Sequence, residues 1–535
     1  MLRPKLITTL QSYDRRQFAD DLIAGVIVGV VAIPLAIAFA IASGVTPDKG
    51  LWTAIIAGFL ISALGGSRVQ IGGPTGAFVV IVYGIIQQHG IDGLLVATMM
   101  AGVLLVIMGA AQLGDLIKFV PHPVVTGFTS AIGVTILVQQ LDSAFGLAPA
   151  KYPPRAIERL AAYWQNASSV NVAAIGVCAA TLIILLAWPK VSRKVPAPFV
   201  ALLVTTAAAK LFHLPVMTVG DRFGALGAGL PALTLPHVGL ATLRELVVPA
   251  CTIAGLGAIE SLLSAVVADG MIGGRHRPNM ELIAQGAANI VVPLFGGIPA
   301  TGAIARTATN IKSGGRTPVA GITHALTVLL ITLVFGAWAQ IIPLATLAGI
   351  LLIVSYRMIE WRVFSAELRG SRSDAAVLMT VFVLTLLVDL TVGIGVGVVL
   401  ASLLFVRRMA AMTAIRALAV DDTAEEMMPR GVVPRDVEVY EIAGPFFFGA
   451  ADQFKDVLAE VSRKPRLLIV RMGHVPFIDS TGLNVLRDLI RRTQRDGTRV
   501  VLVELQDQAR AAIERSELLG ADGIRPTLEI ALNEA

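Results

Sequence analysis

Two short glycine-rich segments with nearly the same sequence interrupt long apolar stretches of the chain. They are Gly-Gly-Pro-Thr-Gly-Ala at residues 72–77 and Gly-Gly-Ile-Pro-Ala-Thr-Gly-Ala at residues 296–303, and an uncharged helical pattern restarts after each. A helix that restarts inside a membrane presents unpaired N–H groups at the positive end of its dipole. Two such ends facing each other could hold an anion, and paired breaks are typical of transporter binding sites. The alternative is a pair of kinks accommodated by neighbouring helices.

Few charged residues lie within the apolar stretches, and each is costly at membrane depth. Glu260 lies near the middle of one stretch, and Ser264 follows four residues later, on the same helix face. Arg306 lies about one turn into the helix that follows the second glycine-rich segment. Glu260 and Ser264 could bind a coupling cation, or Glu260 could carry a proton, while Arg306 adds positive charge beside an anion. The alternative is an ion pair between Glu260 and Arg306 that only neutralises two buried charges.

The composition is that of a membrane protein. Of 535 residues, 55% are hydrophobic and 15% are charged, and the mean hydropathy is +0.76. With about 20 apolar residues needed per crossing, we expect about fourteen spans, some of them short. They run roughly over 22–43, 51–66, 76–88, 93–112, 120–141, 170–189, 196–212, 244–268, 281–296, 302–312, 319–336, 338–356, 375–389 and 391–406.

The basic residues predict the orientation of these spans. If the N-terminus is cytoplasmic, every even-numbered helix ends inside, and those ends carry Lys or Arg, as the positive-inside rule requires. The residues are Arg68, Lys118, Lys190, Arg275, Lys312, Arg357 and Arg407, each alone or with close neighbours. The net charge of +6 therefore reflects topology rather than affinity for nucleic acid.

The two halves of the membrane region align with each other. A shift of about 225 residues, as inverted repeats of this size allow, lays the two glycine-rich segments over each other. The same shift lays the first helix over the helix that carries Glu260. We therefore expect two seven-helix inverted repeats, with the third and tenth helices as half-helices.

The last hundred residues form a different kind of sequence. We expect a cytoplasmic segment at residues 1–20, a membrane domain at 21–408, a polar linker at 409–435 and a small soluble α/β domain at 436–535. Short apolar strands are predicted at 437–442, 467–472 and 500–504, with helices at 451–463 and 482–496 between them.

Several of these stretches together resemble the SulP family of sulfate permeases and related solute-carrier anion transporters. They are Asp21-Leu-Ile-Ala-Gly25, Ile33-Pro-Leu-Ala-Ile-Ala-Phe-Ala40, Gly73-Pro-Thr-Gly76, Glu260-Ser-Leu-Leu-Ser264 and Thr301-Gly-Ala-Ile-Ala-Arg-Thr307 with Asn310. The resemblance covers nearly the whole chain. It implies a homodimer in which a core domain moves, elevator-like, against a gate domain, with the anion between the third and tenth helices.

The resemblance also implies where ligands bind. The family's anion site falls on Thr75, Gly76, Ala77, Gly302, Ala303 and Arg306. The cation site of its bicarbonate-transporting branch falls on Glu260, Ser264, Gly302 and Ile304. That branch has Asp and Thr in place of Glu260 and Ser264, and a hydroxyl residue in place of Ile304. A longer carboxylate with fewer oxygen partners suits a proton better than sodium.

The C-terminal domain has a resemblance of its own. Phe477-Ile-Asp-Ser-Thr-Gly-Leu483 resembles the signature loop of STAS domains, in which Asp479 can cap the following helix. Ser480 occupies the position that is phosphorylated in soluble relatives, so Asp479 and Ser480 are regulatory candidates. The ordinary alternative for this loop in permeases is a purely structural role.

We therefore expect a secondary active transporter of a small oxyanion, most readily sulfate, in the cytoplasmic (inner) membrane with both termini inside. Sodium-coupled bicarbonate transport, C4-dicarboxylate transport and a membrane-anchored signalling scaffold are the alternatives. No enzyme is expected, since nothing assembles a nucleophile with a base, and no cofactor, metal site or nucleic-acid partner is indicated. His122, between two prolines at a helix start, is expected to serve a local turn.

Overall fold

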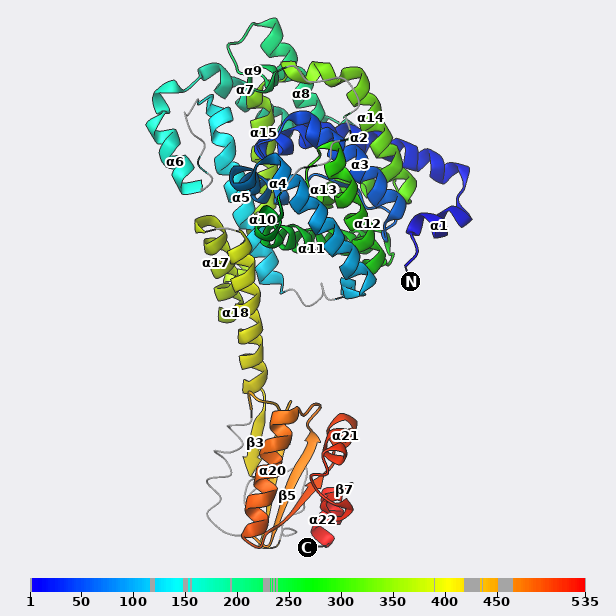
Figure 1. The fold of residues 1–535 in the computed structure, drawn as a ribbon, viewed down its shortest axis with the longest axis vertical. Coiled ribbons are helices and arrows are strands. Elements are labelled where there is room, and N and C mark those ends of the chain that lie inside the picture. The colour runs from blue at the N-terminus through cyan, green and yellow to red at the C-terminus, as the bar shows by residue number, and fades with distance from the viewer. Residues whose placement is uncertain are drawn as a thin grey trace. The chain divides into compact units, whose positions relative to one another are not determined.

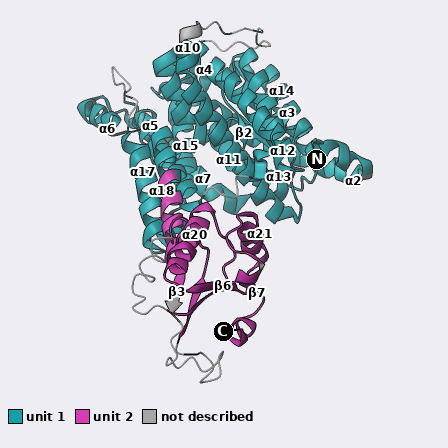
Figure 2. Ribbon diagram, turned by 60° about the horizontal axis from the view of Figure 1, so that its bottom comes forward, with its two compact units in different colours: residues 1–398 teal, residues 399–535 magenta. Residues whose placement is uncertain are grey.

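The computed structural model describes residues 2–115, 121–147, 156–192, 195–224, 239–388, 390–417, 436–450 and 465–534, together with residues 153, 231, 233, 236 and 434. The chain divides into two compact units, residues 1–398 and residues 399–535 (Figure 2). The helix predicted at residues 451–463 and most of the predicted linker lie outside the described residues.

In its described residues, unit 1 contains helices and one pair of two-residue strands (Figure 1). Its helices are α1 (Lys5–Thr9), η1 (Leu10–Ser12), α2 (Arg15–Ala42), α3 (Pro47–Leu64), α4 (Gly76–Ala110), α5 (His122–Phe145), α6 (Ala156–Gln165), η3 (Ala167–Ser169), α7 (Val172–Val191), α8 (Ala197–Leu211), α9 (Val219–Phe223), α10 (Leu240–Glu245), α11 (Val247–Ile272), α12 (Pro278–Val291), η4 (Val292–Phe295), α13 (Ile304–Lys312), α14 (Pro318–Phe335), η5 (Gly336–Ile341), α15 (Leu344–Met358), α16 (Trp361–Leu368), α17 (Arg372–Leu387) and α18 (Leu390–Ala411), the last of which continues into unit 2.

Every segment predicted to span the membrane overlaps a helix, although two of them share one. The predicted spans 76–88 and 93–112 form the two parts of α4, which meet at Gly90, a residue with φ 69° and ψ −172°. Within the described residues, eight helices are long and apolar enough to cross a membrane alone. Since α13 has only nine residues, it is too short for a full crossing. The number of crossings therefore stays a prediction.

Glycines allow the helices of unit 1 to approach closely. A Cβ on Gly102 of α4 would lie 2.7 Å from the Gly286 carbonyl oxygen of α12, and a Cβ on Gly286 would lie 2.6 Å from that of Gly102. On α2, a Cβ on Gly25 would lie 2.5 Å from the Ala320 carbonyl oxygen of α14. Small residues at such crossings are the usual means of packing helices in membranes, where lipid tails weaken the hydrophobic drive.

Two buried carboxylates fasten loops of unit 1. Glu281 of α12 accepts the N–H groups of Gly66 (2.8 Å) and Ser67 (3.0 Å), in the loop that leads to the first glycine-rich segment. Asp21 of α2 accepts the N–H of Arg316 (2.8 Å) and the hydroxyl of Thr317 (2.5 Å), directly before α14. Both carboxylates are 0% exposed, so their hydrogen bonds offset the cost of burial and hold these loops in place.

Unit 2 contains a five-stranded sheet in the order β3-β4-β5-β6-β7. The edge strand β3 runs antiparallel to β4, and the remaining neighbours are parallel. Apolar side chains are buried on both faces of the sheet, as expected where helices cover parallel strands. The elements are β3 (Ala414–Ala417), β4 (Val437–Ala443), β5 (Leu467–His474), α20 (Ser480–Arg495), β6 (Arg499–Val503), α21 (Asp507–Arg515), η6 (Ala521–Gly523), β7 (Ile524–Arg525) and α22 (Leu528–Asn533).

Candidate functional site

The two glycine-rich segments pair with each other in the interior of unit 1. Strand β1 (Gly72–Gly73) runs antiparallel to β2 (Thr301–Gly302), and all four residues are buried. The N–H of Ala303 extends the pairing with a 2.8 Å hydrogen bond to the Ile71 carbonyl. Segments more than 220 positions apart in the sequence thus meet at one point.

A helix begins directly after each paired strand. Thr75 is the N-cap of α4 and Ala303 is the N-cap of α13, and neither side chain accepts a hydrogen bond from its helix. The first-turn N–H groups of both helices therefore have no side-chain cap, and each N-terminus carries about half a positive charge. This arrangement is the one that binds anions at helix ends.

Arg306 joins the two half-helices. Its Nη2 donates a 2.5 Å hydrogen bond to the carbonyl oxygen of Pro74. Its Nη1 lies 2.6 Å from the position of a Cβ on Gly73, which has φ +146°, so only glycine leaves room for the guanidinium. The residue is 2% exposed, and Nη1 has no hydrogen-bond partner in the part of the chain that the structure describes. Burying a cation with an unpaired N–H donor costs free energy unless a ligand accepts the hydrogen bond of that donor.

Glu260 and Ser264 of α11 each contact a different half-helix. The Glu260 Oε2 accepts a 3.0 Å hydrogen bond from the hydroxyl of Thr75, the N-cap of α4. The Ser264 hydroxyl lies 3.5 Å from the Thr307 hydroxyl of α13. Among the described residues no ion pair joins Glu260 to Arg306, so the alternative in which the two only neutralise each other is not formed.

The remaining predicted anion-site positions are small because other groups fill the space beside them. Gly76 and Ala77 are buried at the start of α4. A Cβ on Gly302 would lie 1.7 Å from the side-chain nitrogen of Gln70. Ala303 is 7% exposed, whereas the Ile304 side chain is 39% exposed and offers no oxygen to a cation.

Gln70 belongs to the site but was missed in the sequence. Its Nε2 donates a 3.2 Å hydrogen bond to the Ser261 carbonyl, and its Oε1 has no partner among the described residues. It thereby connects the first glycine-rich segment to α11, next to Glu260. A lone amide two positions before the glycines, in a stretch without charge, could have indicated it.

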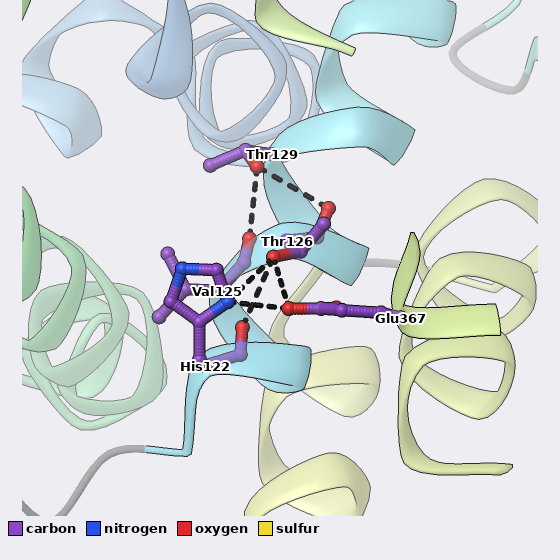
Figure 3. Close-up of polar contacts among 5 residues, drawn as sticks. All are labelled: His122, Val125, Thr126, Thr129 and Glu367. Atoms are coloured by element: carbon purple, nitrogen blue, oxygen red, sulfur yellow. Dashed lines mark hydrogen bonds and ion pairs between the residues drawn. The ribbon is translucent and has the colours of Figure 1, made fainter. Parts of the chain in front are cut away.

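His122 does not serve only a local turn, contrary to expectation. Its ring Nδ1 contacts the Glu367 carboxylate of α16, which also accepts the Thr126 hydroxyl at 3.1 Å (Figure 3). These contacts tie the first turns of α5 to α16, 245 positions away in the sequence. The partner lies too far along the chain for local spacing to reveal it.

In unit 2, Asp479 is the N-cap of α20. Its Oδ1 accepts the N–H of Gly482 at 2.8 Å, and its Oδ2 accepts the N–H of Phe448 at 3.2 Å. The carboxylate therefore fixes both the helix start and the loop after β4, while Ser480 is exposed. Ser480 therefore stays a regulatory candidate.

Comparisons with known proteins agree with this fold. The family model described as the sulfate permease family matches residues 18–381, and the STAS domain model matches residues 430–531. The murine anion transporter Slc26a9, solved in an inward-facing state, gives a TM-score of 0.90 at 19% identity, over 100% of this chain and 94% of that one. At that identity the likeness is one of fold alone.

Two relatives are similar in sequence over almost their whole length. YvdB of Bacillus subtilis, named as a candidate sulfate transporter, is 43% identical over 510 residues, which is 95% of each chain. The bicarbonate transporter BicA of Picosynechococcus is 31% identical over 524 residues, which is 94% of this chain and 91% of BicA. The chain therefore belongs to the sulfate permease family and carries a C-terminal STAS domain.

Proposed function

We propose that this protein carries a small inorganic oxyanion, most readily sulfate, across the cytoplasmic membrane by secondary active transport. The observation that supports this most is the free Nη1 of buried Arg306 beside two helix N-termini without side-chain caps. Together these groups supply hydrogen-bond donors and positive charge, and sulfate supplies acceptor oxygens and negative charge. The name of YvdB points to the same anion, while that of BicA favours bicarbonate as the alternative.

Coupling is proposed to use a proton on Glu260. The carboxylate accepts only the Thr75 hydroxyl among the described residues, and Ile304 offers no side-chain oxygen, so a sodium ion would find few ligands here. Thr75 directly follows Pro74, the acceptor for Arg306. A proton on Glu260 would change the hydrogen bond to Thr75 and so alter the start of α4. Because the proton also removes a negative charge near the anion, proton binding would strengthen anion binding, and linkage makes the effect reciprocal.

The transport cycle is proposed to be an elevator-like movement of a core domain that holds the half-helices against a gate domain. We further propose a homodimer in the inner membrane, with the N-terminus and the STAS domain cytoplasmic. These assignments follow the positive-inside pattern and the family resemblance. A signalling scaffold that only needs an anchor would require neither the paired half-helices nor Glu260.

The test is uptake of labelled sulfate by purified protein in liposomes. Unlabelled sulfate, bicarbonate and a C4-dicarboxylate compete, under an imposed pH gradient or an imposed sodium gradient. We expect sulfate to compete best, the pH gradient to drive accumulation, and Glu260→Gln to exchange anions without gradient-driven accumulation. Glu529→Gln, which replaces an exposed carboxylate in α22 of unit 2, is the matched control.

Two results would contradict the proposal. Sodium-driven uptake without a response to the pH gradient would show that the coupling ion is sodium rather than a proton. Stronger competition by bicarbonate or the dicarboxylate than by sulfate would show that one of these is the preferred substrate. The proposed location of the anion site would not change.

A further inference from the structure

A second protonatable side chain lies buried behind the anion site. His324 of α14 is 0% exposed. Its ring packs against Gly58 of α3, where a Cβ would lie 3.1 Å from ring atoms Cε1 and Nδ1 and 3.5 Å from the Gly72 carbonyl oxygen. The imidazole and the Gly72 carbonyl of β1, the strand that leads into α4, thus both lie against Gly58.

The two ring nitrogens of His324 lack hydrogen-bond partners among the described residues. Neither ring nitrogen makes a hydrogen bond of acceptable geometry with the described residues, although the Gly321 carbonyl one turn earlier is close enough to attract one of them. The Ser62 hydroxyl, which packs against Gly321, also lacks a partner among the described residues. A leucine or methionine would fill this space without burying polar atoms, so the imidazole carries a cost that packing alone does not offset.

The charges around the ring favour a response to an anion. The Arg306 guanidinium packs against Gly73, and the carbonyl of the preceding residue, Gly72, packs against Gly58 together with the imidazole. On the elements packed against α14, Asp21 of α2 binds Thr317, about 10 Å along α14 from His324. Lys49 of α3, with neighbouring Asp48, lies about 13 Å along that helix from Gly58. In α1, Lys5 is held at Gly65 by its main-chain N–H.

We infer that His324 is a second proton-binding group of the transporter, which takes up a proton when an anion binds beside Arg306. The inference rests on the proposed proton symport. In the empty site, burial and, to a smaller extent, the Arg306 charge oppose a positive charge on the imidazole. A bound oxyanion cancels the Arg306 charge and adds negative charge nearby, and the protonated ring can donate to the Gly321 carbonyl oxygen, which offsets part of the cost of burial. With Glu260, the site then offers two protonatable groups, which match the two negative charges of sulfate.

The experiment measures protons taken up when sulfate is added to the purified full-length protein. A pH indicator in weakly buffered detergent solution reports uptake between about pH 5 and pH 8, the range in which histidine titrates. Sulfate affinity is measured across the same range. The variants are His324→Gln, Glu260→Gln and, as a histidine control, His276→Gln, which alters a cytoplasmic-side histidine that already pairs with Asp269 at 2.7 Å.

We expect the wild type and His276→Gln to take up the same number of protons per sulfate, and His324→Gln to take up fewer. Glu260→Gln keeps the part due to His324, so its sulfate affinity still rises as the pH falls through the histidine range. Unchanged uptake in folded His324→Gln would overturn the inference and leave proton symport standing. No uptake in the wild type would overturn both.

If His324→Gln does not fold, a second variant tests the inference. The smaller variant His324→Asn repeats the measurement, with folding checked by gel filtration. Independently of either variant, a sulfate affinity of Glu260→Gln that does not change with pH would refute the role of His324.

Discussion

At the scale of single residues, Arg306 is the residue on which the proposed anion site depends most. Its guanidinium is buried, donates one hydrogen bond across to the first glycine-rich segment and keeps a second donor free. Because it makes no ion pair with Glu260, its charge is not cancelled by that carboxylate. The side chain is therefore better placed to attract a ligand than to stabilise the fold.

Arg306→Ala should weaken sulfate binding while leaving the protein folded. A hydrogen bond to a charged group contributes roughly 1.5–3 kcal/mol, so the Kd should rise about 10- to 100-fold. Calorimetric titration gives the Kd, and thermal unfolding in detergent gives the stability. A variant that fails to fold would show that the contact of Arg306 with Pro74 mainly stabilises the fold.

At the scale of elements, the site needs two strands to approach each other without side chains between them. Gly302 faces Gln70 so closely that even a methyl group would displace the amide, which is 4% exposed. The same closeness lets the N-termini of α4 and α13 start beside each other. The glycines are therefore what allows the two helices to begin side by side.

Gly302→Ala and Ala303→Leu should therefore impair transport in a protein that still folds. Overpacking costs about 1–3 kcal/mol of stability, and the added atoms move the helix N-termini away from the anion; a similar loss in anion binding lowers sulfate uptake about 5- to 150-fold. The matched control is Gly84→Ala on α4, where a Cβ would meet nothing within 4 Å. Normal uptake by Ala303→Leu would show that the ends of the half-helices do not form the anion site.

The junction between the N-terminal segment and α14 predicts a pH dependence. Burial, with the nearby negative charge of Asp21, raises the pKa of Tyr13 to about 12. The folded state then holds the phenolic proton more tightly than the unfolded state, whose pKa is about 10. Stability should therefore fall as the pH rises from about 10 to about 12.

Tyr13→Phe should lose this part of the pH dependence, because it has no proton to release. The difference in unfolding midpoint between wild type and variant, measured at several alkaline pH values, isolates the tyrosine from other titrating groups. Parallel curves would show that the hydrogen bond of Tyr13 to Asp21, 3.1 Å long, does not couple to folding.

At the scale of the whole molecule, the two compact units have separate cores and separate sequence signatures. All residues of the proposed anion and proton sites lie in unit 1. The STAS domain contributes none of them, which makes it a candidate for regulating assembly or rate.

Removing the chain from about residue 436 on should leave a membrane unit that still binds sulfate. We expect altered dimer stability, trafficking or rate with the same order of anion competition. Binding to the truncated protein, compared with the full chain in the same detergent, is the measurement. A changed anion preference would place part of the specificity in the STAS domain.

The sequence alone determined the membrane character, the family and the positions of both helix restarts. These features depend on local composition, on glycine and proline, and on motifs a few residues long. The small α/β domain was predicted for the same reason, since its strands alternate over short stretches. Nothing at long range was needed for these conclusions.

Only the tertiary structure decided which of these residues meet. Glu260 was expected near Arg306, yet it binds Thr75, while Arg306 reaches across to Pro74. The contacts of Gln70 with α11 and of His324 with α3 exist only because these helices pack around β1 and β2. Side-chain partners across helices depend on the rotation and spacing of those helices, and hydrophobic periodicity does not encode which buried polar atom faces which.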